Sequence, residues 1–212
     1  MTPKLVHDGD TGPLPPRERG TRERLLLSAC ELFLANGYEG TSVAVIAQRA
    51  EAFPNQVTHH FGGKEALFVE ATSRMVLRTA KQAELRTRQS PTPEAHARGL
   101  ISYLLGPGSG VIMLFAEAML MSRRRDALSR IIRDTIEELR IAGEAAMVDT
   151  LMRTGWRLRT TPDMVSRGFW SAILGLALEK AALGAEFDYT SAEAAALMMI
   201  NLDGHLADRT ER

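Results

Sequence analysis

The sequence predicts an all-α protein. Apolar residues recur at the three- and four-residue spacing of helices through almost the whole chain, and Gly or Pro separates these runs. We find no alternating run long enough for a useful strand and no internal repeat. The 212 residues are 45% hydrophobic, which is enough for a sizeable core in roughly one or two domains.

The chain begins with a segment that resembles a disordered arm. It holds four of the nine prolines and shows no apolar periodicity, so residues 1–19 are predicted to be disordered. Basic residues mark the end of the arm and the residues after it: Arg17, Arg19, Arg22 and Arg24. They indicate either a solvated tail or a basic arm that lies along a nucleic-acid backbone.

Three short helical segments follow the arm. A helix is predicted over about 21–36, with Leu25, Leu26, Ala29, Leu32 and Phe33 facing inward, and Gly37 ends it. Thr41 or Ser42 is expected to cap a second helix, and Pro54 to open a third that runs to about residue 61. Beyond Gly62-Gly63, helices are predicted at about 64–89, 93–105, 110–122, 126–155, 162–184 and 191–207.

Two short helices joined by a tight turn and braced by a preceding helix form a helix-turn-helix unit. Within this unit the third helix turns Val57 and Phe61 inward. Its outer face then carries five hydrogen-bonding side chains of a size to reach base edges or phosphates: Asn55, Gln56, Thr58, His59 and His60.

The stretch from Leu25 to Ala71 resembles the DNA-binding domain of the TetR family of bacterial transcriptional regulators. Three groups of residues carry the resemblance: Ala29, Phe33 and Gly37; then Thr41, Ser42, Ile46 and Ala47; then the run from Val57 to Leu67. It implies a helix-turn-helix DNA-binding domain at 20–66 and a ligand-binding and dimerisation domain at 67–212. It also implies DNA contacts at the starts of the second and fourth helices and along the third: Thr41, Ser42, Asn55, Gln56, Thr58, His59, His60 and Lys64.

The resemblance assigns different roles to these positions. Asn55 and Gln56 would read adenines in the major groove, because their amides can pair with N6 and N7. Lys64 would meet a phosphate at the positive end of the fourth helix. Three positions depart from the family pattern: Glu51 replaces a turn glycine, Phe53 a Ser or Thr cap, and Thr58 a tyrosine. We expect Glu51 to be strained at positive φ, so that Glu51→Gly raises the melting temperature.

Charge and chemistry narrow the function classes. Lys+Arg and Asp+Glu are both 26, and residues 17–66 carry six basic and six acidic groups, so any DNA affinity depends on charge placement.

Cys30 lies in an apolar stripe and is interpreted as a core residue. His59-His60 lacks the partners of a metal site, and His7, His96 and His205 are expected on the surface or in loops. The Arg123-Arg124-Arg125 run is interpreted as a solvated corner.

The larger domain offers candidates for a pocket and a dimer interface. Ten methionines suit either an adaptable core or a pocket wall. The pocket candidates are Leu104, Met113, Phe115, Met119, Met147, Leu151 and Trp170. Apolar stripes on the last two helices suit a four-helix interface between two chains, or burial within one chain. The interface candidates are Phe169, Ile173, Ala177, Ala181, Ala195, Met199 and Leu202.

The sequence therefore predicts a ligand-responsive repressor that binds a palindromic operator on double-stranded DNA as a homodimer. A small apolar or amphipathic molecule would release it. The alternative is a helical ligand-binding or protein-interaction module with weakened DNA reading. No nucleophile elbow or phosphate-binding glycine loop supports an enzyme, and we expect no cofactor and no metal. No signal peptide or membrane-length apolar run is seen, so a cytoplasmic location is expected.

Overall fold

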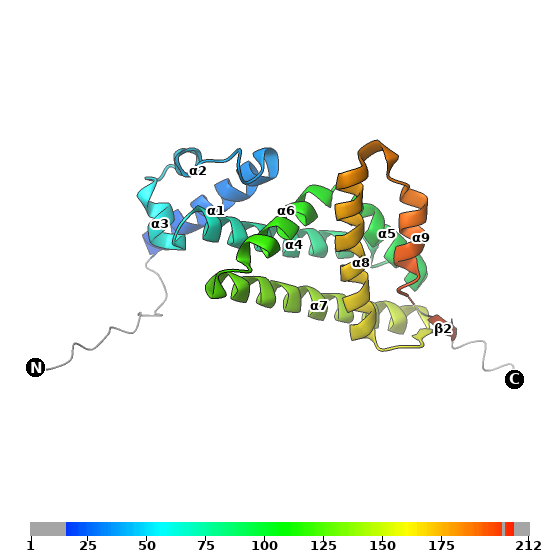
Figure 1. Cartoon of the computed structure of the whole chain (residues 1–212). Coiled ribbons are helices and arrows are strands. Elements are labelled where there is room, and N and C mark those ends of the chain that lie inside the picture. Colours follow the sequence, from blue (N-terminus) through cyan, green and yellow to red (C-terminus); the bar gives the residue numbers. More distant parts are fainter. Residues whose placement is uncertain (1–15, 201, 206–212) are drawn as a thin grey trace, which may run out of the picture.

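The computed structural model describes residues 16–200 and 202–205, and side chains are described from Gly20 onward, except at 204 and 205. This part of the chain folds into nine α-helices, one short 3-10 helix and two short strands (Figure 1). The helices of the first lobe and the long connecting helix are α1 (Pro16–Asn36), α2 (Val43–Arg49), α3 (Asn55–Phe61) and α4 (Lys64–Thr87). The remaining elements are α5 (Pro93–Leu105), α6 (Ser109–Ser122), α7 (Asp126–Thr154), β1 (Trp156–Leu158), α8 (Pro162–Leu183), η1 (Gly184–Glu186), α9 (Tyr189–Leu197) and β2 (Leu202–His205).

The N-terminal lobe is a compact unit of α1, α2, α3 and the first turns of α4. Phe33 of α1 and Phe68 of α4 are fully buried and meet edge to face, with ring centroids 4.9 Å apart. The short helices add Ile46 and Val57, which are also fully buried. A seven-residue helix cannot persist alone, so this shared core holds α2 and α3 in place.

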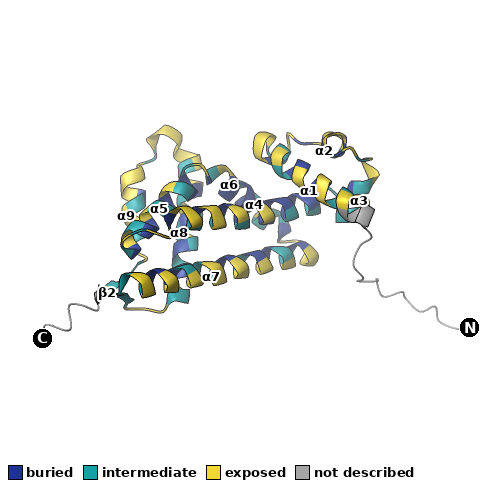
Figure 2. Ribbon diagram, turned by 180° about the vertical axis from the view of Figure 1, so that it is seen from behind, coloured by how far each residue is buried: buried dark blue, intermediate teal, exposed yellow. Residues whose placement is uncertain are grey.

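The second lobe surrounds the rest of α4. Helices α6 and α7 pack along α4, and α8 packs against α7, so that the buried faces of all four point inward (Figure 2). Helix α4 therefore belongs to both lobes and connects them. In the described part of the chain, no single helix is long and apolar enough to cross a membrane. The pair α5 and α6 passes that test only together and is bent by 73°.

Most predicted helix boundaries are close to those observed. Ser42 caps α2 by accepting a hydrogen bond from the Val45 N–H at 3.2 Å, and Gly37, Gly62 and Gly155 adopt positive φ where helices end. Helix α1 begins at Pro16, five residues before the predicted start. Of the arm predicted to be disordered over 1–19, residues 16–19 instead belong to α1, and residues 1–15 lie outside the described residues.

The C-terminal end of the chain differs from the prediction. The last helix was expected over about 191–207, but α9 ends at Leu197 and the chain then forms β2. This strand pairs antiparallel with β1, with Trp156 opposite His205. Asp203 and Gly204 are poor helix formers, which explains why the apolar spacing did not continue the helix. Both strands are too short for alternation to predict them.

Candidate functional sites

The outer face of α3 lies at the far end of the N-terminal lobe, remote from α9 and β2 (Figure 1). Asn55, Thr58 and His59 are exposed there, while Gln56 and His60 are half-buried. Val57 faces the core on the opposite side of the helix and is fully buried. The structure thus brings the five predicted side chains of α3 together at one end of the molecule.

Gln56 has a structural role that the sequence did not reveal. Its side-chain oxygen accepts a hydrogen bond from the Phe53 N–H at 3.0 Å, and its own N–H donates to the Phe53 carbonyl at 3.0 Å. This reciprocal pair satisfies the Phe53 N–H, which lies just before α3 and would otherwise have no acceptor. The side chain at this position is an exposed phenylalanine, which cannot cap the helix as Ser or Thr would. The side-chain nitrogen of Gln56 is not used in this contact and stays available for a partner.

The turn between α2 and α3 adopts the predicted strained conformation. Glu51 has φ of +51° and is the one non-glycine residue with positive φ in the described part of the chain. Its N–H donates to the Gln48 carbonyl at 3.2 Å, and the Ala52 N–H donates to the Ala47 carbonyl at 2.9 Å. These two bonds form a Schellman motif, in which the left-handed position normally holds glycine.

The predicted contacts at the helix starts differ in accessibility. Thr41 is 1% exposed, and its hydroxyl contacts the carbonyls of Leu32 (3.2 Å) and Gly37 (2.9 Å), so it braces the end of α1 instead of facing outward. Ser42 is exposed as the cap of α2. Lys64, the first residue of α4, is half-buried with Nζ 4.0 Å from the Tyr38 ring centroid. Thr41 is therefore removed from the surface set, while Ser42 and Lys64 remain.

The basic side chains of this lobe are engaged with the protein itself. Arg22 forms two 2.6 Å hydrogen bonds with the Glu70 carboxylate, and Arg49 pairs with Glu31 at 2.5 Å. Arg24 Nε donates to the Ala50 carbonyl at 2.9 Å and so caps the end of α2. These contacts brace the helices and pair Arg22 and Arg49 with carboxylates, although Arg24 and Arg49 stay exposed.

The second lobe contains a cavity of about 510 Å³ between α4, α5, α7 and α8. Its wall is mainly apolar, with Leu100 and Leu104 from α5, Met147 from α7, Phe169 and Trp170 from α8. Ile200, which follows α9, also lines it. A hollow of this size and character suits a small, largely apolar molecule.

The predicted pocket residues divide among several places. Leu104, Met147 and Trp170 line the main cavity, while Phe115, Met119 and again Trp170 line a neighbouring space of about 150 Å³. Met113 lines the cleft described below, between the lobes. Leu151 lines none of these three hollows.

Several polar residues line the cavity that were not predicted, among them His96 and Glu84. His96 was expected in a loop or on the surface, but it lies in α5, lines the cavity and is 1% exposed. Its Nε2 is 3.1 Å from Oε2 of Glu84, another lining residue. The spacing could have revealed it, because His96 lies four residues before Leu100 in the apolar stripe of α5.

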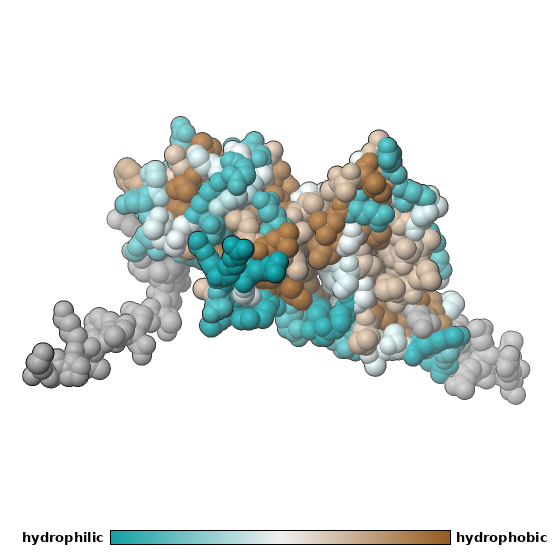
Figure 3. All heavy atoms as spheres, viewed as in Figure 1, coloured by the Kyte–Doolittle hydropathy of each residue, from teal (hydrophilic) through white to brown (hydrophobic). Residues whose placement is uncertain are grey.

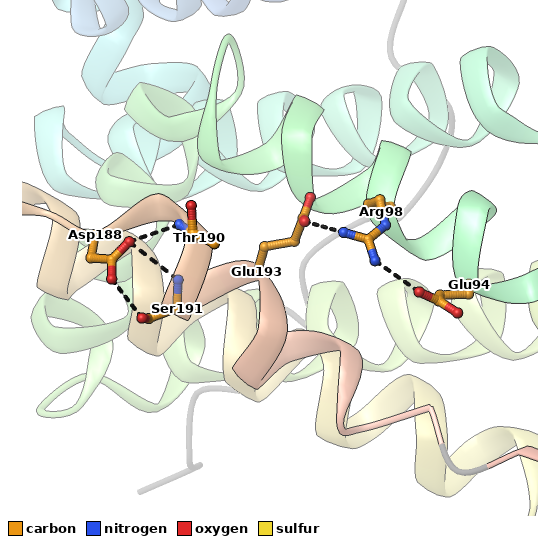
Figure 4. Close-up of polar contacts among 6 residues, drawn as sticks. All are labelled: Glu94, Arg98, Asp188, Thr190, Ser191 and Glu193. Carbon is orange, nitrogen blue, oxygen red and sulfur yellow. Dashed lines mark hydrogen bonds and ion pairs between the residues drawn. The ribbon is translucent and has the colours of Figure 1, made fainter.

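Helix α9 is fastened over α5, which positions the segment that carries Ile200. Arg98 of α5 pairs with Glu94 at 2.8 Å and also with Glu193 of α9 (Figure 4). Asp188 caps α9 by accepting hydrogen bonds from the Thr190 and Ser191 backbone N–H groups, as Figure 4 also shows. The hydroxyl of Ser191 donates to the same carboxylate, and this bond lowers the pKa of Asp188.

An apolar cleft separates the two lobes (Figure 3). It has a volume of about 410 Å³, and its lining includes Leu34 of α1, Leu120 of α6 and Leu178 of α8. These three side chains are 51%, 65% and 45% exposed, respectively, so the cleft is open. Helix α6 contacts α1 of the first lobe and α7 and α8 of the second, so this cleft lies at the junction of the two lobes.

The predicted dimer residues are only partly accessible. Phe169, Ile173 and Ala177 are buried, so these three lie in the core of their own domain, with Phe169 on the cavity wall. Leu202 is half-buried in β2 and does not continue a helical stripe. Ala181, Ala195 and Met199 are exposed and remain on the surface of the C-terminal lobe.

Cys30 was predicted as a core residue; it is half-buried and packs against the hydrophobic core. Its thiol is 3.6 Å from the Ala71 carbonyl, and burial raises the pKa of the thiol to about 11. In the described part of the chain, no three His, Cys, Asp or Glu side chains cluster in a way that could hold a metal ion.

Comparison with known proteins identifies the family. Residues 25–71 match the family model of bacterial regulatory proteins of the tetR family, and residues 93–199 match that of a bacterial transcriptional repressor C-terminal domain. A crystal structure of a candidate transcriptional regulator from Rhodococcus sp. RHA1 is 43% identical with a TM-score of 0.77. The match covers 85% of this chain and 95% of that one. The chain belongs to the TetR family of bacterial transcriptional regulators. The predicted family and all-α fold are confirmed.

Other known proteins resemble a segment of this TetR-family chain or share its fold. The transcriptional regulator TcmR from Streptomyces glaucescens is 49% identical over 47 residues, which is 22% of this chain and 21% of TcmR. BetI from Burkholderia thailandensis is 41% identical over 68 residues, or 31% of this chain and 34% of BetI. The chain thus covers well under two thirds of these curated relatives. EbrR, described as a multidrug binding protein complexed with imidazole, shares the fold at 20% identity, with a TM-score of 0.62 over 90% of this chain and 98% of EbrR.

Proposed function

We propose that this TetR-family chain is a repressor that binds a palindromic operator as a homodimer and leaves it when a small molecule enters the cavity of the second lobe. The observation that carries the proposal is that one helix, α4, packs against the outward-facing α3 near its start and lines the 510 Å³ apolar cavity nearer its end. We further propose that it acts in the cytoplasm and catalyses no reaction, in keeping with a family of regulators.

The DNA contacts in this proposal are the accessible members of the predicted set. Asn55 would read a base edge at the start of α3, with the free amide nitrogen of Gln56 beside it. Thr58, His59 and His60 would follow along the groove. Ser42 and Lys64 would contact phosphates at the starts of α2 and α4.

The dimer in this proposal uses surfaces of α8 and of the segment that follows α9. Leu178 and Leu183 of α8 are 45% and 42% exposed, and Met198 after α9 is 78% exposed. Ala181 adds a small exposed side chain that permits close approach. Two copies joined there would place two α3 helices on half-sites about 34–36 Å apart, one turn of DNA.

In this proposal, a ligand in the cavity releases the chain from DNA by changing the orientation of α4. The cavity is lined by Leu77, Ala80 and Glu84 in the C-terminal half of this helix, while its N-terminal turns pack under α3. A ligand that fits one orientation of α4 better than another would shift the balance between the DNA-bound and free states. A shift of a few ångströms at α3 would spoil the half-site spacing.

The test is selection of bound duplexes from a random library by the purified chain at two salt concentrations. The proposal predicts an enriched palindrome with two half-sites and weaker binding at the higher salt. Replacing both Asn55 and Gln56 by alanine should relax the preference at one or two base pairs, whereas the matched control Gln89→Ala, an exposed amide of the other lobe, should not. No enrichment at low salt would favour the alternative, a helical ligand-binding module with weakened DNA reading.

Two specific observations favour that alternative. The cations Arg22 and Arg49 are held in ion pairs, and the α2–α3 turn carries a strained glutamate in place of glycine. Under this alternative the cavity would bind its ligand with no specific DNA binding in any condition.

A further inference from the structure

The side chain of Phe53, in the turn before α3, is an aromatic ring that the fold does not use. It is 75% exposed, whereas Tyr189, the other exposed Phe, Tyr or Trp side chain in the described part of the chain, is 36% exposed. Among the described residues, the Phe53 ring meets no other ring and no cation, and it is not part of the hydrophobic core. The ring therefore does little for the stability of the lobe.

The backbone on both sides of Phe53 is held by hydrogen bonds. Its N–H donates to Oε1 of Gln56 and its carbonyl accepts from the Gln56 N–H, each at 3.0 Å. Just before it, the Ala52 N–H donates to the Ala47 carbonyl at 2.9 Å, and Ala52 packs against the core. The exposed ring is thus attached to a fixed backbone, so that only its two side-chain torsions remain to be ordered when it binds a partner.

Phe53 adjoins the surface that is proposed to read DNA. It lies two residues before Asn55, the first residue of α3, and Asn55, Thr58 and His59 are exposed on this helix. The N-terminal residues of a recognition helix are the ones that approach base edges in the major groove. A ring held beside them is within reach of the same groove.

The chemistry of the ring limits what it can contact in that groove. A phenyl ring has no hydrogen-bonding group and no charge to pair with a phosphate. The base edges in the major groove present polar donors and acceptors, and the C5 methyl of thymine is the apolar group among them. Contact between the ring and this methyl group removes both from water, which is favourable.

We infer that Phe53 is a further specificity residue, whose ring contacts the methyl group of a thymine beside the base read by Asn55. This inference rests on the proposed function, because it adds a reader to the same DNA-binding surface. The contact makes the chain prefer a thymine at that position of each half-site.

The test replaces thymine by deoxyuridine, which removes only the methyl group. In the palindrome obtained by duplex selection, each thymine is replaced in turn at the symmetric positions of both half-sites, and binding is measured by fluorescence anisotropy of the labelled duplex. At one position, the replacement should weaken binding of the wild-type chain about fourfold per half-site, the value of one buried methyl group. In Phe53→Ala the same replacement should change binding less than about twofold per half-site.

Further variants separate the DNA contact from folding. Phe53→Ser supplies a side chain that can cap α3, so it should keep or raise the melting temperature and still lose the deoxyuridine effect. It decides the result if the alanine variant fails to fold. Phe53→Leu keeps an apolar side chain and should retain part of the effect. The matched control Leu85→Ala removes a 54% exposed apolar side chain near the end of α4 and should leave the effect unchanged.

Several results would overturn the inference. Equal deoxyuridine effects in the wild-type chain, Phe53→Ala and Phe53→Ser would mean that the ring reads no methyl group. A loss of affinity in these variants that is the same for every duplex would place the ring against the sugar-phosphate backbone. If the wild-type chain selects no palindrome, the proposed function fails as well. A selected palindrome without a thymine whose effect depends on Phe53 refutes only the role of Phe53.

Discussion

Replacement of Glu51 by glycine should stabilise the protein, and the turn geometry sets the size of the gain. Glu51 has φ of +51° at the left-handed position of a Schellman motif. A residue with a β-carbon costs about 1–2 kcal/mol in this conformation. Glycine removes that cost but gains about 0.4–1 kcal/mol of flexibility in the unfolded chain. The net gain is about 0.5–1 kcal/mol.

The assay is denaturant and thermal unfolding followed by far-UV circular dichroism. For a chain of this length each kcal/mol shifts the melting temperature by about 2–4 °C, so Glu51→Gly should raise it by about 1–4 °C. Glu51→Asn should give part of this gain, because asparagine tolerates positive φ. Glu51→Ala is the matched control, since it removes the charge but keeps the β-carbon.

The controls make the reasoning refutable. Glu51 forms no ion pair with the described residues, so removal of its charge alone should change little. If Glu51→Ala raises the melting temperature as much as Glu51→Gly, then charge and not backbone strain is responsible. If Glu51→Gly is neutral or destabilising, the positive φ of Glu51 does not lower the stability of the protein.

Three further predictions concern single contacts. The thiol of Cys30 should react with a thiol reagent at pH 8 at least about 100-fold more slowly in the folded than in the unfolded chain, because burial raises its pKa from 9.0 to about 11. Equal rates would contradict its burial. Arg74 holds the pKa of Glu23 below its ordinary 4.5. The loss of stability caused by Glu23→Gln should therefore be constant above about pH 5 and become smaller as the pH falls below 4.5. Thermal melts of both proteins across this pH range measure the difference. The exposed 2.8 Å pair of Arg125 and Glu65 should contribute less than about 1 kcal/mol, and a double-mutant cycle with a larger coupling would refute this.

The helix-turn-helix could be predicted because its signals are local. Ser42 before an apolar patch, Gly37 at a helix end and Gly62-Gly63 between helices each determine the nearby backbone. The strain at Glu51 was also predicted, since the position in the motif requires positive φ whatever residue occupies it. Such features depend on neighbours within one or two helical turns.

The accessibility of the site residues could not be predicted in the same way. Thr41 and Ser42 are adjacent and both suit a cap, but only the packing of α2 against α1 buries Thr41 beneath the Leu32 carbonyl. Gln56 resembled a base reader, yet its oxygen is used by the Phe53 N–H. The partner of each residue became known only when the helices were placed.

The sequence by itself determined the helical fold, most helix limits, the exposed face of α3 and the strain in its turn. Only the tertiary structure decided that Ile173 fills its own core, that β1 pairs with a strand far along the chain, and that His96 meets Glu84 inside a cavity. The physical reason is the separation along the chain of the residues that interact. Caps and turns are fixed by bonds between residues close in sequence, whereas burial, strand pairing and the solvation of a polar group depend on which distant segments pack together.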